Sequence, residues 1–424
     1  MNREYLKQVI VDQKEMYLNN PMIKRDIELE ISINYCFVGI RRSGKSYMLY
    51  QMVKHLEEGD VLRNEILYVN FEDERLLEAT AEDLNMILEI GLEMADGKRP
   101  YIFLDEIQNV PGWANYVRRL ADMKYKVSVT GSNSKMLSSE IASTLGGRFM
   151  IVQVFPYSFK EYLHALGANK DYLQVLTTSE RAEISGIYEQ YVRYGAFPEL
   201  INIRNKRVYL NSIYQTIYIG DVLTRNNITN DFAVRLILKK IAESVTKPIS
   251  FSRLANILNS AGAGIGKQTV INYVGYMIDA YLLFTVQNYA GKLIDKETSP
   301  KYYFMDTGLL GLLTMDSDTA QLENLVAIEL VRRFGIDGVF YFERNVEIDF
   351  YVPEAKLAIQ VSYSITGDIA TRERELNAFS KLHNFIPDAE CLLITNSEEA
   401  AIEYNGIYVN VMPAWKWLLK NERN

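Results

Sequence analysis

The chain has 424 residues, with 46 Lys and Arg against 54 Asp and Glu, so its formal net charge is −8. Hydrophobic residues make up 48% and charged residues 24%, a composition typical of soluble globular proteins that excludes a wholly disordered chain. At roughly 150 residues per domain the length predicts two to four domains, and no apolar run approaches the ~18 residues that a membrane-spanning helix needs.

The cysteine and histidine content restricts the cellular setting and the metal chemistry. Cys36 and Cys391 are the two cysteines and lie far apart in sequence, so a disulfide framework is excluded and a reducing cytoplasm is expected. The N-terminal residues alternate charged and apolar side chains and lack the apolar core of a signal peptide. Three His and two Cys argue against a Cys/His zinc site, whereas a carboxylate site for Mg²⁺ stays open. We expect a cytoplasmic protein without a membrane partner.

The first part of the chain alternates helix-like and strand-like segments. Tyr5, Leu6, Val9 and Ile10 recur at helical spacing and predict an N-terminal helix. Further helices are expected at 47–56 and 113–123, and strands at 31–38, 66–71, 101–104 and 127–130. Strands that alternate with helices predict an α/β fold with a parallel sheet covered on both faces.

A phosphate-binding motif follows the first expected strand. The segment GIRRSGKS fits G-x-x-x-x-G-K-[ST] and opens the next expected helix, which is the context that this motif requires. Its residues are the candidate phosphate ligands: Gly39, Ile40, Arg41, Arg42, Ser43, Gly44, Lys45 and Ser46. Glycines allow the backbone amides to approach phosphate oxygens, and the helix N-terminus adds partial positive charge. Lys45 would reach the β- and γ-phosphates and Ser46 would bind Mg²⁺. Arg41 and Arg42 are either phosphate ligands or solvated loop charges.

Two carboxylates end a second buried strand about 60 residues later. The segment YIFLDE places Asp105 and Glu106 directly after four apolar residues, at the strand end where ligands bind in such sheets. Asp105 is expected to hold the magnesium shell, and Glu106 to orient or polarise the attacking water. A strand-end turn with two exposed acids is the alternative, and the preceding phosphate motif favours nucleotide binding.

Three further residues are candidates for a role in hydrolysis. Ser132 and Asn133 follow the strand 127–130, where a small polar side chain would sense the γ-phosphate; a cap of the next helix is the alternative. Arg148 follows two glycines and would serve as an arginine finger in a neighbouring subunit's site, or it closes a surface turn.

The pattern changes after Phe155-Pro156. Helices are expected up to about Asn227, interrupted at Gly195-Ala196-Phe197-Pro198, and residues 228–306 then predict helices followed by a hairpin. A helix from about Gln321 precedes three more strands. The strands expected in this part are 282–289, 301–305, 339–344, 346–352 and 357–363. They predict a small α/β unit at the C-terminus.

A series of motifs runs in a fixed order through nearly the whole chain. They are GIRRSGKS, YVNFEDERL, FLDEIQNV, VTGSNSKMLSSEI and FPYSFKEYL, followed by GAFPEL, KYYFMDTGLL, LENLVAIEL, EIDFYV and TREREL. The series resembles the prokaryotic AAA-type ATPases that carry a C-terminal domain of unknown function. The resemblance implies four domains: an AAA-like core at 1–154, a helical lid at 155–227, a winged-helix-like domain at 228–310 and a restriction-nuclease-like domain at 311–424. It also implies adenine as the base, with ATP and Mg²⁺ as cofactors.

The winged-helix-like segment is the candidate surface for a partner. From Asp231 to Lys292 seven Lys and Arg face three Asp and Glu, a local net charge of 7 − 3 = +4 in an acidic chain. Lys267, Gln268 and Asn272 lie off the apolar face of one helix, and Asn or Gln can read adenine edges. Winged helices also dock proteins, so DNA binding and protein docking both stay open.

The C-terminal domain departs from the pattern of the nucleases that it resembles. Glu323 and Asp349 match two acidic positions, but the last strand carries Gln360 and Ser362 where a carboxylate and a lysine are expected. A neutral amide binds Mg²⁺ weakly, and serine supplies no positive charge near a phosphate. Unless Lys356 or Arg372 takes the place of that lysine, cleavage should fail, so we expect a degenerate nuclease fold used for binding.

Together these patterns predict a magnesium-dependent ATPase. In the first hypothesis ATP hydrolysis drives or gates the C-terminal half, which acts on DNA, with a homo-oligomer as a candidate assembly. In the second the chain is a slow nucleotide-gated switch that recruits a protein partner without acting on nucleic acid. A P-loop small-molecule kinase is a third reading, against which the Asp105-Glu106 pair and the large C-terminal half argue.

Overall fold

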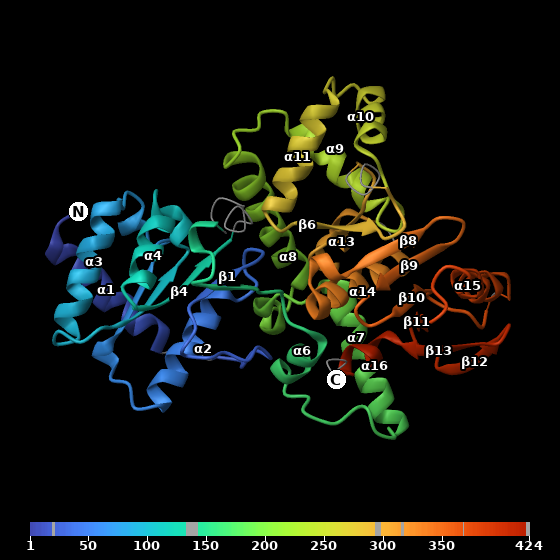
Figure 1. Cartoon of the computed structure of the whole chain (residues 1–424), viewed down its shortest axis with the longest axis horizontal. Helices are drawn as coiled ribbons and strands as arrows, with labels where there is room; N and C mark the ends of the chain where they lie inside the picture. Colours follow the sequence, from blue (N-terminus) through green and yellow to red (C-terminus); the bar gives the residue numbers. More distant parts are fainter. Residues whose placement is uncertain (19–21, 133–142, 293–297, 315–317, 368, 421–424) are drawn as a thin grey trace. The chain divides into compact units, whose positions relative to one another are not determined.

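The computed structural model describes residues 1–18, 22–132, 143–292, 298–314, 318–367 and 369–420. The chain divides into two compact units, Met1–Phe155 and Pro156–Asn424 (Figure 1). Among the described residues no helix combines the length and the apolar character needed to cross a membrane. Cys36 and Cys391 are both free and buried.

The first unit is built on a five-stranded sheet with the order β2-β3-β4-β1-β5. Its strands are Tyr35–Val38 (β1), Ile66–Asn70 (β2), Tyr101–Asp105 (β3), Lys126–Gly131 (β4) and Met150–Gln153 (β5). All neighbouring strands pair in parallel, so their carboxyl ends meet at one edge of the sheet. This confirms the predicted α/β class with a parallel core sheet.

Helices cover both faces of this sheet, as the continuous apolar strands predict. They are Arg3–Leu18 (α1), Lys45–Glu58 (α2), Ala81–Met94 (α3) and Trp113–Asp122 (α4). On one face α2 packs in a core cluster with Tyr35, Phe37 and Tyr68. On the other face, α3 approaches β2 so closely that a Cβ at Gly91 would lie 2.6 Å from Leu67 Cδ2. Successive strand residues therefore serve opposite faces, and the site at the sheet edge rests on a core packed from both sides.

The second unit begins with helices and continues into a mixed sheet. Its helical segments are Phe159–Ala165 (α6), Thr178–Tyr194 (α7), Pro198–Asn202 (η5), Lys206–Gln215 (α8), a π-helical turn at Thr216–Thr224 (η6), Asp231–Ala242 (α9), Phe251–Ser260 (α10), Lys267–Asp279 (α11), Thr307–Leu313 (α13), Asp318–Phe334 (α14), Ile336–Gly338 (η7), Ile369–Leu382 (α15) and Ala414–Leu419 (α16). The exposed positions of α11 include Lys267, Gln268 and Asn272, while Val270 and Val274 are buried, as its apolar spacing predicts.

The sheet of the second unit has eight strands in the order β12-β13-β11-β10-β9-β8-β6-β7. They are Leu283–Asn288 (β6), Lys301–Phe304 (β7), Phe340–Glu343 (β8), Glu347–Val352 (β9), Leu357–Val361 (β10), Glu390–Thr395 (β11), Ala400–Tyr404 (β12) and Ile407–Pro413 (β13). The predicted hairpin is present as the antiparallel pair β6–β7, and β6 also pairs in parallel with β8. The hairpin is therefore continuous with the C-terminal strands in one sheet (Figure 1).

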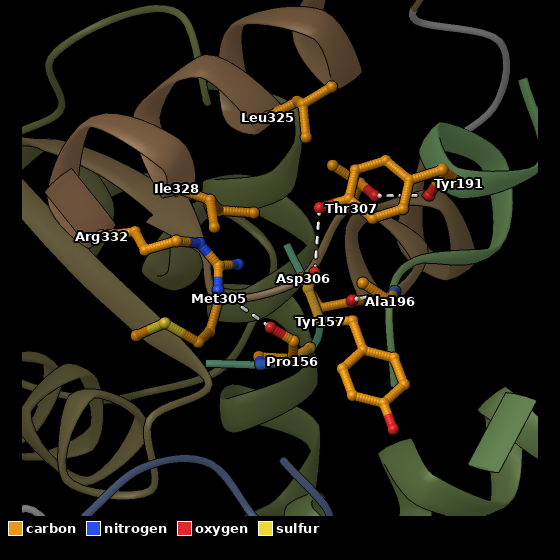
Figure 2. A pocket seen from close by; sticks show the side chains of 10 residues that line it. All are labelled: Pro156, Tyr157, Tyr191, Ala196, Met305, Asp306, Thr307, Leu325, Ile328 and Arg332. Carbon is orange, nitrogen blue, oxygen red and sulfur yellow. Dashed lines mark hydrogen bonds between the residues drawn. The ribbon is translucent and has the colours of Figure 1, made fainter. Parts of the chain in front are cut away.

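A buried joint connects two motifs of the second unit that lie far apart in sequence. Asp306 caps α13 by accepting hydrogen bonds from the amides of Gly308 (2.9 Å) and Leu309 (3.3 Å), and its second oxygen accepts one from Ala196 N (2.8 Å). Gly195 has φ +77°, and a Cβ there would lie 2.0 Å from Asp306 Oδ1, so glycine is required. Figure 2 shows the small pocket at this joint, with Tyr191 also in its wall.

Candidate nucleotide site

The phosphate loop joins β1 to α2 in a conformation that depends on its glycines. Gly44 has φ +97° and is the N-cap of α2, and Gly39 has φ +149°. A Cβ at Gly39 would lie 2.3 Å from the carbonyl oxygen of Val154, which follows β5. The N-terminus of α2 therefore opens directly at the end of the loop, and its free amides and dipole favour an anion there.

The side chains of the loop present a buried cation and a buried hydroxyl. Lys45 is 4% exposed, and its Nζ donates to Ile40 O at 3.3 Å and lies 3.4 Å from Glu106 Oε1. Ser43 Oγ is buried without a hydrogen-bond partner among the described residues. A buried polar atom without a partner is costly, and a phosphate oxygen would satisfy it.

Asp105 lies at the end of β3 in a set of hydroxyl donors. Tyr68 OH donates to Oδ2 at 2.7 Å, Thr130 Oγ1 donates to Oδ1, and Ser46 also forms a side-chain hydrogen bond to this carboxylate. Burial, and then the charge of Glu106, raise the pKa of Asp105, although the hydroxyl donors act in the opposite direction. A cation beside Asp105 would relieve the cost of its buried charge.

Glu106 adopts a backbone conformation with φ +50°, which is uncommon for a residue other than glycine. Its amide donates to Thr130 Oγ1 at 2.8 Å, and its Oε2 accepts from Gln108 Nε2 at 2.5 Å. Burial alone would raise the pKa of Glu106, but the ammonium of Lys45 and then Gln108 outweigh burial and lower it. Glu106 is therefore a fixed, ionised carboxylate at neutral pH.

The other predicted residues differ in whether they lie near Asp105 and Glu106. Ser132 is buried, and its Oγ lies 3.5 Å from Gln108 Nε2, so it belongs to the Glu106 cluster. Asn133 lies outside the described residues. Arg41 pairs with Glu72 at 2.5 Å, and Arg42 has φ +67° in the loop.

Arg148 does not enter the phosphate site of its own chain. It precedes β5, and its backbone carbonyl accepts a hydrogen bond from Asn34, which precedes β1. Both positions lie at the amino ends of the parallel strands, whereas the phosphate loop lies at their carboxyl ends. The Arg148 guanidinium pairs with Asp122 at 2.5 Å. Its role as an arginine finger in a neighbouring subunit stays a prediction.

A buried arginine that belongs to no motif forms a hydrogen bond to the phosphate loop. Arg25 is 3% exposed and donates to the carbonyl oxygens of Ser43 at 2.9 Å and of Phe155 at 2.7 Å. Its own amide donates to Gln51 Oε1 on α2 at 3.0 Å. One guanidinium thus links the phosphate loop to Phe155, the last residue of the first unit.

We predict that Arg25→Met raises hydrogen exchange in peptides covering 39–46, because two buried carbonyls lose their donor. At about 1–3 kcal/mol for each of the two unsatisfied groups, local stability falls by about 2–6 kcal/mol. Arg25→Lys should recover only part of this, since one ammonium does not reproduce the planar fork. The matched control is Arg63→Met, which removes an exposed arginine paired with Glu57. Equal exchange in the Arg25→Met and Arg63→Met variants would show that Arg25 does not hold the loop.

The residues present fit a magnesium ion that arrives with a nucleotide. Among the described residues, no group of three or more His, Cys, Asp or Glu side chains is arranged to hold a metal ion. Ser46 and Asp105 offer side-chain oxygens and already form a hydrogen bond with each other. Mg²⁺ is commonly bound by one or two such groups together with substrate phosphates and water, so the phosphates would complete its shell.

Four residues of this centre receive no role from the sequence analysis, although three of them lie inside the quoted motifs. Tyr68, Thr130 and Gln108 contact the carboxylates, and Arg25 holds the loop. Thr130 lies on the strand after the acidic pair, so the rule that ligands gather at strand ends could have indicated it. Arg25 lies in a segment between α1 and β1 without a motif, and only the fold identifies it.

Comparisons with known proteins identify the family of the chain. The family described as "AAA domain" matches residues 34–163, and "Domain of unknown function (DUF8612)" matches residues 185–320. The uncharacterized protein MJ1544 of Methanocaldococcus jannaschii is 33% identical over 431 residues, covering 97% of this chain and 95% of that protein. An uncharacterized protein of Haemophilus influenzae is 29% identical over 388 residues, covering 89% of this chain and 92% of that protein.

Solved structures show more distant likeness. The Walker-type ATPase of Pyrococcus abyssi is 14% identical with a TM-score of 0.39, covering 74% of this chain and 96% of that chain. The Orc1 protein of Aeropyrum pernix in complex with DNA is 15% identical with a TM-score of 0.31, covering 77% and 94%. The family assignment rests on the sequence relatives and the matched domains. The chain belongs to the family of the Methanocaldococcus protein, AAA-type P-loop ATPases with a C-terminal domain of unknown function.

Proposed function

We propose that the protein is a magnesium-dependent ATPase whose nucleotide cycle gates a partner-binding second unit. The observation that carries this proposal is the meeting of Lys45, Asp105 and Glu106 at the carboxyl edge of the parallel sheet. The three charged side chains come from two separate motifs. Their convergence places three groups in one buried cluster: Lys45 as a cation that binds phosphate, Asp105 as a candidate metal ligand and Glu106 as a candidate base.

In the proposed reaction, the loop amides and Lys45 bind the phosphates, and Ser46 and Asp105 hold Mg²⁺. The metal ion supplies charge stabilisation at the phosphoryl oxygens. Glu106 orients a water molecule and accepts its proton, for which its lowered pKa keeps it ionised. Gln108 fixes the carboxylate at 2.5 Å.

Nucleotide binding would rearrange the ion pair between Lys45 and Glu106. The pair spans 3.4 Å, and both side chains are less than a tenth exposed. A phosphate group that attracts Lys45 frees Glu106 to meet water, so substrate binding itself would assemble the base. The same phosphate contacts the loop that Arg25 fastens to Phe155. We propose this bridge as the route by which occupancy of the site reaches the end of the first unit.

We propose DNA as the first candidate partner, contacted through residues 228–310. The exposed polar positions of α11, Lys267, Gln268 and Asn272, support this choice, as does the local charge of +4. A protein partner is the second candidate. We further propose that subunits associate so that Arg148 reaches a neighbouring site.

The test is release of inorganic phosphate from ATP with Mg²⁺, measured for the wild type and for Lys45→Ala with and without duplex DNA. We expect the wild type to hydrolyse ATP and Lys45→Ala not to, because the variant lacks the cation that binds the phosphates. A rise with DNA that disappears at high salt would support the DNA reading. Turnover that DNA does not alter would favour the protein-recruitment switch.

An absence of wild-type turnover under every condition, with ATP still bound, would remove the enzyme proposal. A small-molecule kinase would instead transfer phosphate to an acceptor without releasing it, so the phosphate assay separates that reading as well. The exposed pair of Lys98 and Glu65 offers a matched control, Lys98→Ala, which should turn over ATP like the wild type.

A further inference from the structure

The amide of Gln108 lies beside the Glu106 carboxylate in an orientation that its contacts determine. Gln108 belongs to the short 3₁₀ helix Ile107–Asn109 (η3), which follows β3 and Glu106. Its Nε2 donates to Glu106 Oε2 at 2.5 Å and lies 3.5 Å from Ser132 Oγ. An ionised carboxylate only accepts hydrogen bonds, so the amide atom that faces it must be the nitrogen. The other end of the amide is therefore the acceptor Oε1.

Gln108 Oε1 is buried and has no hydrogen-bond partner among the described residues. The hydroxyl of Ser132 meets the amide through Nε2, and it also forms a hydrogen bond to Glu106. Because the carboxylate only accepts, this second bond uses the hydroxyl proton of Ser132. Buried polar atoms are almost always paired, since an unpaired one is costly. Oε1 therefore calls for a donor that the described side chains do not supply.

The chemistry of the site restricts what this donor is. Ionised phosphate oxygens only accept hydrogen bonds, so the phosphates of a nucleotide cannot pair with Oε1. The ammonium of Lys45 lies 3.4 Å from Glu106 Oε1, which is the opposite oxygen of the carboxylate from the one that Gln108 contacts. A water molecule donates two hydrogen bonds, and the two atoms of the Gln108 amide lie next to each other. One water can therefore donate to Glu106 and to Gln108 Oε1 together.

We propose that Gln108 Oε1 binds the water that attacks the γ-phosphate, with Glu106 as the second acceptor of the same water. This inference rests on the proposed ATP hydrolysis. Two acceptors fix the water and direct its lone pair toward phosphorus, which lowers the cost of reaching the reactive geometry. The water oxygen bonds to phosphorus as the bond from phosphorus to the bridging oxygen breaks, and that electron pair stays on ADP. One water proton passes to Glu106, and Gln108 exchanges none.

The competing role for Gln108 is to hold Glu106 through Nε2 without touching the water. A double-mutant cycle between Gln108→Leu and Glu106→Gln separates the two roles, read as single-turnover phosphate release at saturating ATP and Mg²⁺. Rates are compared on the alkaline plateau of the pH profile, where every Glu106 is ionised. Gln108→Leu alone should release phosphate about tenfold more slowly, with unchanged nucleotide affinity.

The Glu106→Gln chain decides between the roles, because its amide oxygen still offers Nε2 an acceptor. In that chain Gln108→Leu should slow release further by about threefold or more, since the contact with water does not need the carboxylate. The Mg²⁺ concentration for half-maximal release should not change, because Ser46 and Asp105 are the proposed metal ligands. Gln108→Met, which keeps the length of the side chain, repeats the cycle if Gln108→Leu does not bind nucleotide.

Gln8→Leu is the matched control. The amide of Gln8 also donates to a carboxylate, Asp12 Oδ1 at 2.6 Å, but on the exposed surface of α1. This variant should release phosphate like the wild type.

Three results would overturn the proposal. One is a loss of less than about threefold in Gln108→Leu alone. Another is an effect that disappears in the Glu106→Gln chain, because the amide would then act only through the carboxylate. The third is a raised Mg²⁺ requirement in Gln108→Leu, which would mean that Oε1 binds the metal ion instead of water. A wild type that binds ATP and releases no phosphate would remove the proposed function itself, so the wild-type rate distinguishes that failure from these.

Discussion

Glu106→Gln is expected to bind ATP with at least wild-type affinity and to release phosphate about 10²–10⁴-fold more slowly, the range that general base catalysis contributes. The amide keeps the shape and the contact with Gln108, which donates to Oε2 at 2.5 Å. It removes the charge that orients water and pairs with Lys45 at 3.4 Å. Lys45 is then free for the phosphates, so affinity should not fall. Single-turnover phosphate release and titration with a fluorescent nucleotide measure the two effects separately.

The control is Glu89→Gln, which removes an exposed carboxylate paired with Arg3 at 3.2 Å in the same unit. It should leave both quantities unchanged. A Glu106→Gln variant whose turnover stays within about threefold of wild type would show that the carboxylate does not act on water. Ser132 would then be the next candidate to position the water, through its contact with Gln108 at 3.5 Å.

The strands that sequence reasoning found share one physical feature. β1 and β3 are continuous buried runs, and such runs bounded by turn residues predict central strands of a parallel sheet. β5 has mostly half-exposed or exposed residues, because it lies at the sheet edge, and it was not predicted. β12 is likewise a partly exposed edge strand. β11 is buried over Cys391–Thr395 and carries the same signal as β3, so it was within reach of the same argument.

The residues of the site are also of two kinds: some belong to a local sequence motif, and others are brought together only by strand pairing. Lys45, Asp105 and Glu106 could be predicted because each belongs to a motif that carries its chemistry at fixed spacing. Tyr68 reaches Asp105 only because β2 and β3 pair in the register that sets Asn70 beside Asp105. Outside the site, Lys301 of β7 reaches Asp349 of β9 only because β6 and β8 join these strands in one sheet. No local sequence signal contains these pairings, since they depend on strand order.

The second large expected effect is a pH dependence of stability, which we expect from Asp306 at the joint between α13 and Ala196. Burial raises the pKa of Asp306 from 3.8 to about 6, although backbone hydrogen bonds act against it. The folded state therefore holds a proton that the unfolded state releases between about pH 4 and 6. The stability that this proton contributes is fully present below about pH 4 and is lost as the pH rises through about 6. The difference between the two pKa values of Asp306 corresponds to about 3 kcal/mol in the free energy of unfolding.

Asp306→Asn cannot titrate, so its stability should lack this component. Hydrogen exchange of peptides covering 195–200 and 306–313, compared between wild type and variant at each pH from 4 to 7, isolates the difference. The wild type should lose protection relative to the variant as the pH rises. This trend is expected even though Asp306→Asn introduces an NH2 group, which is a donor, beside the Ala196 N–H, which is also a donor. Asp337→Asn, at an exposed position, should keep the wild-type profile. Parallel profiles for wild type and Asp306→Asn would mean that the buried carboxylate keeps an ordinary pKa, and that its three amide donors outweigh the cost of burying its charge.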